Sequence, residues 1–75
     1  MTLYEEVLNI AQSYMGLAAT EYLERRCRVS LGINNLENLK KEHLEKLAAA
    51  IEMTATVYIS EEKVKQFKTE ILALK

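Results

Sequence analysis

Residues 17–32 read LAATEYLERRCRVSLG, and this stretch indicates the fold class most directly. Its apolar residues recur at every fourth position, which places them on one face of a helix; they are Ala19, Leu23, Cys27 and Leu31. The opposite face carries glutamate–arginine pairs at the supporting four-residue spacing, Glu21 with Arg25 and Glu24 with Arg28. Gly32 follows the last apolar residue and is suited to end a helix. We therefore predict an amphipathic helix over residues 17–31.

Three further segments have the same helical periodicity and extend the prediction to the whole chain. The segment over residues 3–14 has an apolar stripe of Leu3, Val7, Ile10, Ala11 and Tyr14. The stripe of residues 41–59 is Leu44, Leu47, Ala48, Ile51, Ala55 and Tyr58. The stripe of residues 61–74 is Val64, Phe67, Ile71 and Leu74. Thr2 and Ser60 are suitable N-caps for the first and the last of these segments. Proline and aspartate are absent, and alanine, leucine, glutamate and lysine dominate, which favours helix throughout.

These segments predict an all-α fold. We expect one domain over residues 1–75, built as a small bundle of three to four amphipathic helices with antiparallel neighbours. Gly16 leaves the helix count open. Because glycine costs about 1 kcal/mol relative to alanine inside a helix, Gly16 either ends the first helix, which gives four helices, or lies within a longer one, which gives three.

The composition excludes several classes of protein. The chain has 75 residues, 49% of them hydrophobic, and a net charge of −1, which is not typical of disordered segments. A single cysteine cannot form an internal disulfide, and no apolar run approaches the roughly 20 residues of a membrane span. The start of the chain, MTLYEE, is acidic where a secretory signal is basic, so we expect a cytoplasmic protein that does not enter a membrane.

The sequence lacks patterns that would support catalysis or cofactor binding. Cys27 and His43 fall in different helical segments, so they do not form a local metal site. Two isolated glycines cannot build a phosphate-binding loop, and Ser13, Ser30 and Ser60 have no histidine at a local relay spacing. We therefore predict no metal, no cofactor and no enzymatic activity, with Cys27 in the core and His43 on the surface.

The basic residues are distributed unevenly. All the arginines fall within four positions, at Arg25, Arg26 and Arg28, whereas the other seven basic residues are scattered lysines. Arginine is enriched at protein interfaces, and its planar fork pairs with carboxylates or phosphates. Pairing within the helix accounts for Arg25 and Arg28 but not for Arg26, because Tyr22 stands four residues before it. We therefore predict that Tyr22, Arg25, Arg26 and Arg28 bind a protein partner.

Two other functions are compatible with the same sequence. Nucleic-acid binding through the arginines is the main alternative. Glu21 and Glu24 share that surface and the chain is slightly acidic, so the sequence favours a protein partner over nucleic acid. An enzyme or ligand carrier with a pocket between its helices is the third function considered.

The abundance of apolar residues predicts self-association. Several lie beside or off the main stripes, namely Leu8, Met15, Val29, Leu36, Met53, Val57 and Leu72. Because a domain this small buries only about 60% of its unfolded surface, a second apolar surface would stabilise it through a partner. Two-fold dimers are the commonest arrangement, so we predict a homodimer.

Residues 14–28 read YMGLAATEYLERRCR and are followed by Leu31, Gly32 and Ile33. This part of the chain resembles short helical segments attached to bacterial signalling proteins such as response regulators and serine/threonine kinases. In those segments a glycine starts a helix, and small residues precede an aromatic residue and a basic stretch. The present chain has Leu17 where they often have proline. The resemblance implies a regulatory interaction role and transfers no binding or catalytic residue. The predicted function is therefore a non-enzymatic protein–protein interaction module, regulatory or signalling-associated, that acts as a homodimer and binds an unidentified protein.

Overall fold

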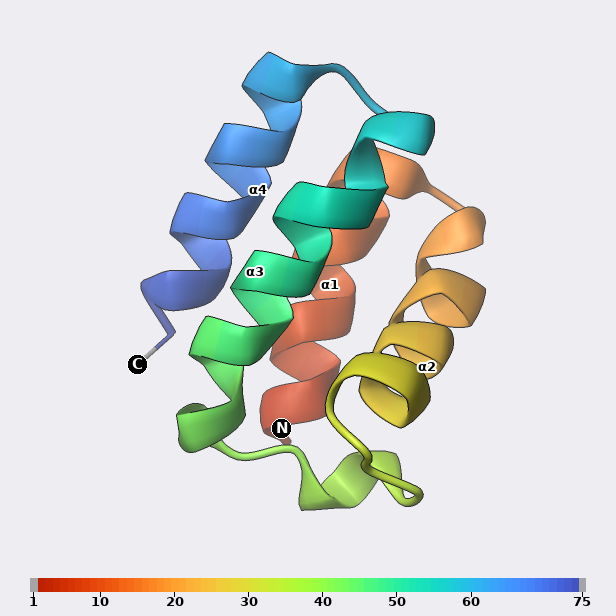
Figure 1. The fold of residues 1–75 in the computed structure, drawn as a ribbon, viewed down its shortest axis with the longest axis vertical. Coiled ribbons are helices and arrows are strands. Elements are labelled where there is room, and N and C mark those ends of the chain that lie inside the picture. Colours follow the sequence, from red (N-terminus) through yellow and green to blue (C-terminus); the bar gives the residue numbers. More distant parts are fainter. Residues whose placement is uncertain (1, 75) are drawn as a thin grey trace.

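The computed structural model describes residues 2–74, and within that range the regular structure is entirely helical. Four α-helices follow one another along this part of the chain: α1 (Leu3–Met15), α2 (Ala18–Ser30), α3 (Leu44–Thr54) and α4 (Glu61–Leu72). Short 3-10 helices occupy the connections, namely η1 (Leu36–Asn38), η2 (Lys41–His43) and η3 (Ala55–Val57). The predicted all-α bundle is therefore confirmed (Figure 1).

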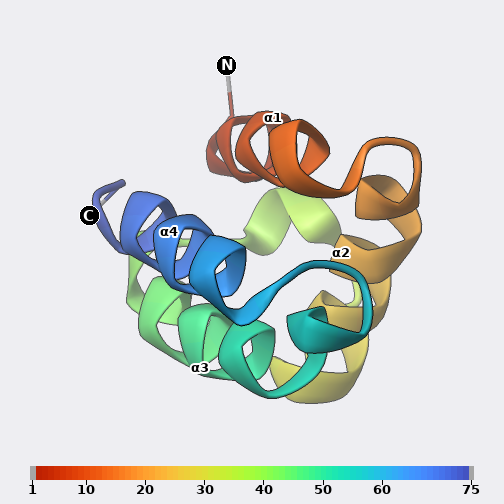
Figure 2. The ribbon, with the colours of Figure 1, turned by 90° about the horizontal axis from the view of Figure 1, so that it is seen from above.

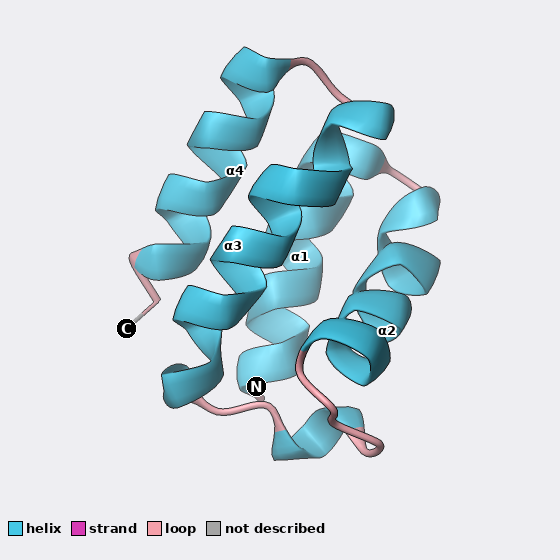
Figure 3. Ribbon diagram, viewed as in Figure 1, coloured by secondary structure: helices cyan, strands magenta, loops and turns pink. Residues whose placement is uncertain are grey.

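The four α-helices run alternately up and down, so neighbours along the chain are antiparallel (Figure 1). Seen from above, they form a ring in which α1 packs on α2, α2 on α3, α3 on α4, and α4 on α1 (Figure 2). The ring measures 29 × 22 × 20 Å and surrounds one apolar core. Short loops and 3-10 turns join the helices (Figure 3). None of the helices within residues 2–74 has the length and apolar content needed to cross a membrane.

The core is built mostly from the predicted apolar stripes, and Tyr22, Ile33 and Leu39 join it from outside them. Its largest fully buried side chains are Phe67, Leu23, Leu44, Leu47, Ile51, Ile71, Val7 and Cys27. Partly buried members of the same stripes pack around them, namely Leu3, Ile10, Tyr14, Leu31 and Leu74. Tyr58 is the exception, because it is 54% exposed. It follows η3, where the helical periodicity that placed it on the stripe is already broken.

Gly16 ends α1 and thereby establishes the helix count. Its φ of +62° and ψ of −131° lie outside the conformations that L-residues readily adopt, so the chain turns here and α2 begins at Ala18. The Gly16 N–H donates to the Gln12 carbonyl (2.9 Å), which satisfies an acceptor at the end of α1. Gly32 has a φ of +68° and follows the end of α2, as predicted.

The predicted single helix over residues 41–59 is wrong at both ends. α3 is shorter than this range, and a 3-10 turn lies on each side of it. Before α3, the Lys40 N–H donates to His43 Nδ1 (3.0 Å), which stabilises a tight turn. After α3, the Tyr58 N–H donates to the Ala55 carbonyl (2.9 Å), three residues back, which is the hydrogen-bond pattern of the 3-10 turn η3.

Candidate partner-binding groove

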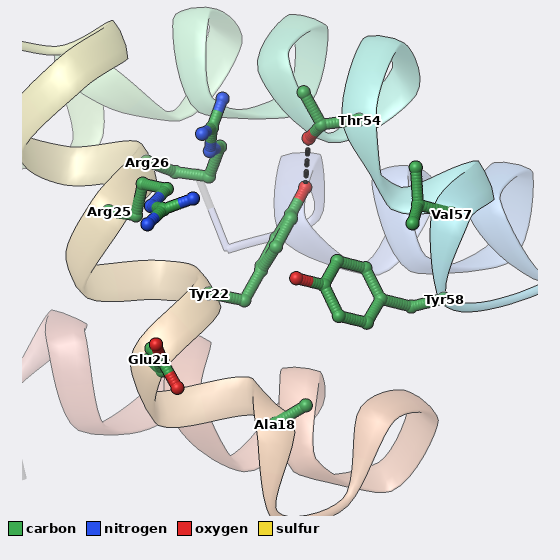
Figure 4. A pocket seen from close by; sticks show the side chains of 8 residues that line it. All are labelled: Ala18, Glu21, Tyr22, Arg25, Arg26, Thr54, Val57 and Tyr58. Carbon is green, nitrogen blue, oxygen red and sulfur yellow. Dashed lines mark hydrogen bonds between the residues drawn. The ribbon is translucent and has the colours of Figure 1, made fainter.

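A groove lies between α2 on one side and α3 with η3 on the other. It consists of two adjoining clefts of about 280 Å³ and 320 Å³, which share Arg26 and Thr54. The first cleft is lined by the eight residues shown in Figure 4. The second is further lined by Ser30 from α2 and by Lys46, Ala49, Ala50 and Met53 from α3. We refer to the two clefts together as the α2–α3 groove.

Tyr22 forms the floor of the first cleft. It is only 5% exposed, and its hydroxyl lies 2.6 Å from Thr54 Oγ1 (Figure 4). The Thr54 hydroxyl donates to the Ala50 carbonyl (2.7 Å), so the Tyr22 O–H is the donor in its bond to Thr54. This bond joins α2 to α3. Burial raises the pKa of Tyr22, because the phenolate would lose its solvation.

The η3 side of the groove is apolar and open to solvent. The Tyr58 ring meets the Tyr22 ring edge-on, with centroids 5.5 Å apart and planes at 73°. Tyr58 nevertheless remains 54% exposed, and its neighbour Val57 is 83% exposed. Met53, four residues before Val57 and within α3, is 82% exposed. These side chains give one wall of the groove an apolar surface that the rest of the described chain does not cover.

The arginines separate into two sets. Arg25 and Arg26 line the first cleft, on the side opposite η3 (Figure 4). Arg28 is exposed and pairs with Glu24 (3.6 Å), as predicted from their spacing. The predicted ion pair between Arg25 and Glu21 does not form. The α2 helix therefore directs two of its arginines to the groove and keeps the third in an intrahelical pair.

Arg26 lies where the two clefts join. Its Cζ atom is 5.9 Å from the centroid of the Tyr22 ring, one helical turn earlier, which is within the range of a cation–π contact. Its Nε atom is buried and has no hydrogen-bond partner among the described residues. Nearly all buried N–H groups in native proteins are paired. The Arg26 guanidinium therefore holds one buried donor without an acceptor where the two clefts join.

The groove is positively charged, although the chain as a whole is not. Its lining includes the cations Arg25, Arg26 and Lys46 and a single carboxylate, Glu21, for a net charge of +2. The whole chain has a net charge of −1. The groove therefore attracts anionic groups more strongly than the average surface of this protein does.

Cys27 in α2 and His43 in η2 lie on different elements, and neither lines the groove. Cys27 is fully buried in the core, as predicted, and burial raises the pKa of its thiol. His43 is half-buried, and its Nδ1 accepts the Lys40 N–H, so it stabilises the turn before α3. Within residues 2–74, no three potential ligands among histidine, cysteine, aspartate and glutamate come together as a metal site.

Of the residues predicted to bind a partner, Tyr22, Arg25 and Arg26 line the groove and Arg28 does not, and the α3–η3 side was not predicted. Thr54 and Lys46 had no local pattern that connected them to the arginines. Met53 and Val57 stood out only as apolar residues off the main stripe, which is the signal that could have found this wall. The groove combines guanidinium donors, hydroxyls and apolar side chains, a set suited to recognition of a partner.

Comparison of the chain with protein-family models, with curated proteins and with solved structures gives no match.

Proposed function

We propose that this chain is a non-enzymatic protein–protein interaction module whose partner docks in the α2–α3 groove. The observation that carries the proposal is the gathering of exposed apolar side chains and arginines at one place. Met53 and Val57 are more than four-fifths exposed on one wall, and Arg25 and Arg26 line the other. Contiguous apolar surface on a soluble domain marks interaction sites, and arginine and tyrosine are enriched in them.

A comparison of groove variants tests this proposal. The chain is immobilised and the proteins it captures from a cell lysate are quantified for the wild type and for a Met53→Ser, Val57→Ser double variant. Leu17→Ser is the matched control, because Leu17 is fully exposed just before α2 and does not line the groove. We expect the same proteins with the wild type and the control and their loss with the double variant. Equal capture by all three proteins would overturn the proposal.

The proposal includes a regulatory role and self-association as a homodimer. Of the off-stripe apolar residues that predicted a dimer, Leu8, Met15 and Leu36 pack against the core. Met53 and Val57 line the groove, so the support for self-association rests on Val29, which is exposed outside it. Light scattering at micromolar concentration tests it, with a dimer mass expected and a monomer mass excluding the dimer.

Nucleic-acid binding receives less support from the same groove. Arg28 is already paired with Glu24, and Glu21 lines the cleft beside Arg25. A phosphate backbone would therefore meet carboxylates as well as guanidinium groups. Retention on heparin or DNA that falls steeply with salt, and that Arg25→Gln abolishes, would favour nucleic acid over a protein partner.

A further inference from the structure

The charge of the α2–α3 groove restricts the chemistry of its occupant. Three cations and one carboxylate line it, within a chain that has a small net negative charge. A partner surface that is acidic would be attracted to this groove, and a basic one would be repelled. Charge complementarity therefore favours an occupant that carries glutamate or aspartate.

The hydrogen bonding of the two groove arginines points to the same chemistry. Arg26 Nε is buried without an acceptor, and Arg25 does not pair with Glu21, the carboxylate four residues before it. A guanidinium offers donors in a planar fork that matches the two oxygens of a carboxylate. A carboxylate placed between these arginines would accept hydrogen bonds from their guanidinium groups.

The apolar wall specifies the rest of the occupant. Met53 near the end of α3 and Val57 at the end of η3 are four residues apart along the chain, and both side chains are exposed and line the groove. The groove runs between two antiparallel helices, α2 and α3, an arrangement that accepts a third helix along its length. Side chains three or four positions apart on such a helix would reach both Met53 and Val57.

Resting on the function proposed above, we propose that the occupant of the α2–α3 groove is an acidic amphipathic helix of another protein. One of its carboxylates binds between Arg25 and Arg26, and its apolar face covers Met53, Val57 and Tyr58. A second copy of this chain fits the charges less well. Two-fold pairing through the groove would bring Arg25, Arg26 and Lys46 of one protomer toward the same cations of its partner, with only Glu21 to offset them.

Selection of peptides by the folded chain tests the proposal. A display library of random peptides several helical turns long is selected on the immobilised wild-type chain, and the dissociation constants of the enriched peptides are measured by fluorescence anisotropy. We expect the enriched peptides to carry glutamate or aspartate together with apolar residues three and four positions apart. Arg26→Gln should weaken their binding by about tenfold or more, because one partner of a desolvated charge pair is lost.

Arg28→Gln is the matched control, since it removes the same charge from the same helix outside the groove. It should change binding by no more than about twofold. Circular dichroism verifies that each variant is folded, and Arg25→Gln serves as a second groove variant with the same expected direction.

Several results would overturn the acidic-helix proposal. Equal weakening by Arg26→Gln and Arg28→Gln would indicate general charge attraction, and enriched peptides without acidic residues would exclude the proposed chemistry. Failure to enrich any peptide would also count against it. A dimer mass that the double Met53→Ser, Val57→Ser variant converts to a monomer would assign the groove to a second copy. In each case the lysate comparison decides separately whether the groove binds a protein at all.

Discussion

The Arg26 guanidinium carbon lies 5.9 Å from the centre of the Tyr22 ring, one helical turn earlier on α2. The same ring meets Tyr58 edge-on and donates its hydroxyl proton to Thr54. Tyr22 thus connects the cationic side of the groove to its apolar side and to α3. This contact also accounts for Arg26, which has no glutamate four residues before it.

Arg26→Ala should change the free energy of unfolding only slightly. The cation–π contact that it removes is worth about 0.5–1 kcal/mol, and removal of the buried, unpaired Nε offsets part of this loss. Urea denaturation followed by circular dichroism measures the change, with Arg28→Ala as the control for loss of an arginine on the same helix. Destabilisation by more than about 2 kcal/mol would show that Arg26 is structural rather than reserved for a partner.

The hydrogen bond between Tyr22 and Thr54 should stabilise the packing of α2 on α3. Tyr22→Phe removes the donor, and we expect a loss of about 0.5–1.5 kcal/mol. Thr54→Val should cost about 1–3 kcal/mol, because it leaves the Tyr22 hydroxyl without its acceptor. Thr54→Ser keeps the hydroxyl and is the control. A Thr54→Val variant as stable as the wild type would exclude this contribution of the hydrogen bond.

Gly16→Ala should destabilise the fold through the backbone alone. An added Cβ would meet no atom within 4 Å, but the φ of +62° with ψ of −131° is strained for an L-residue, at about 1–3 kcal/mol. D-alanine at position 16, introduced by chemical synthesis, places the same methyl group on a backbone that suits it. It should stabilise the chain by about 0.4–1 kcal/mol, and similar thermal unfolding of the two variants would refute this explanation.

Cys27 should react slowly with a thiol reagent while the chain is folded. It is fully buried, and burial raises the pKa of the thiol, so little reactive thiolate is present. Reaction with Ellman's reagent should accelerate as urea unfolds the protein. A Thr56→Cys variant provides an exposed thiol in the same chain as the reference for full reactivity. Equal rates for the two thiols under native conditions would contradict the buried position of Cys27.

Stability should fall at alkaline pH, in part through Tyr14. Its hydroxyl donates to the Glu70 carboxylate, and this bond raises the pKa of Tyr14 in the folded chain. The resulting stability is present in full below the unfolded pKa of about 10 and is lost as the pH rises through the folded pKa. Tyr14→Phe should therefore lose less stability than the wild type over this range, as measured by urea denaturation at increasing pH. An unchanged pH dependence would exclude this role of Tyr14.

The sequence by itself determined the helices and most of the core. Leu23, Cys27 and Phe67 were assigned to the interior because helical periodicity is a local property, and all three are fully buried. The ends of the elements were less predictable. Gly16 was compatible with either a turn or a continuous helix, because the cost of a helical glycine is small enough for packing to offset. Only the folded chain showed that its φ is positive.

Tertiary structure alone decided the groove. Tyr22 and Thr54 are 32 residues apart, and no local pattern predicts that their hydroxyls meet. The sequence separated Met53 and Val57 from the main stripe, but only the packing of α3 against α2 and α4 left them exposed beside Arg26. Helix formation depends on spacing within one segment, whereas a binding surface depends on which faces remain uncovered after the helices have packed.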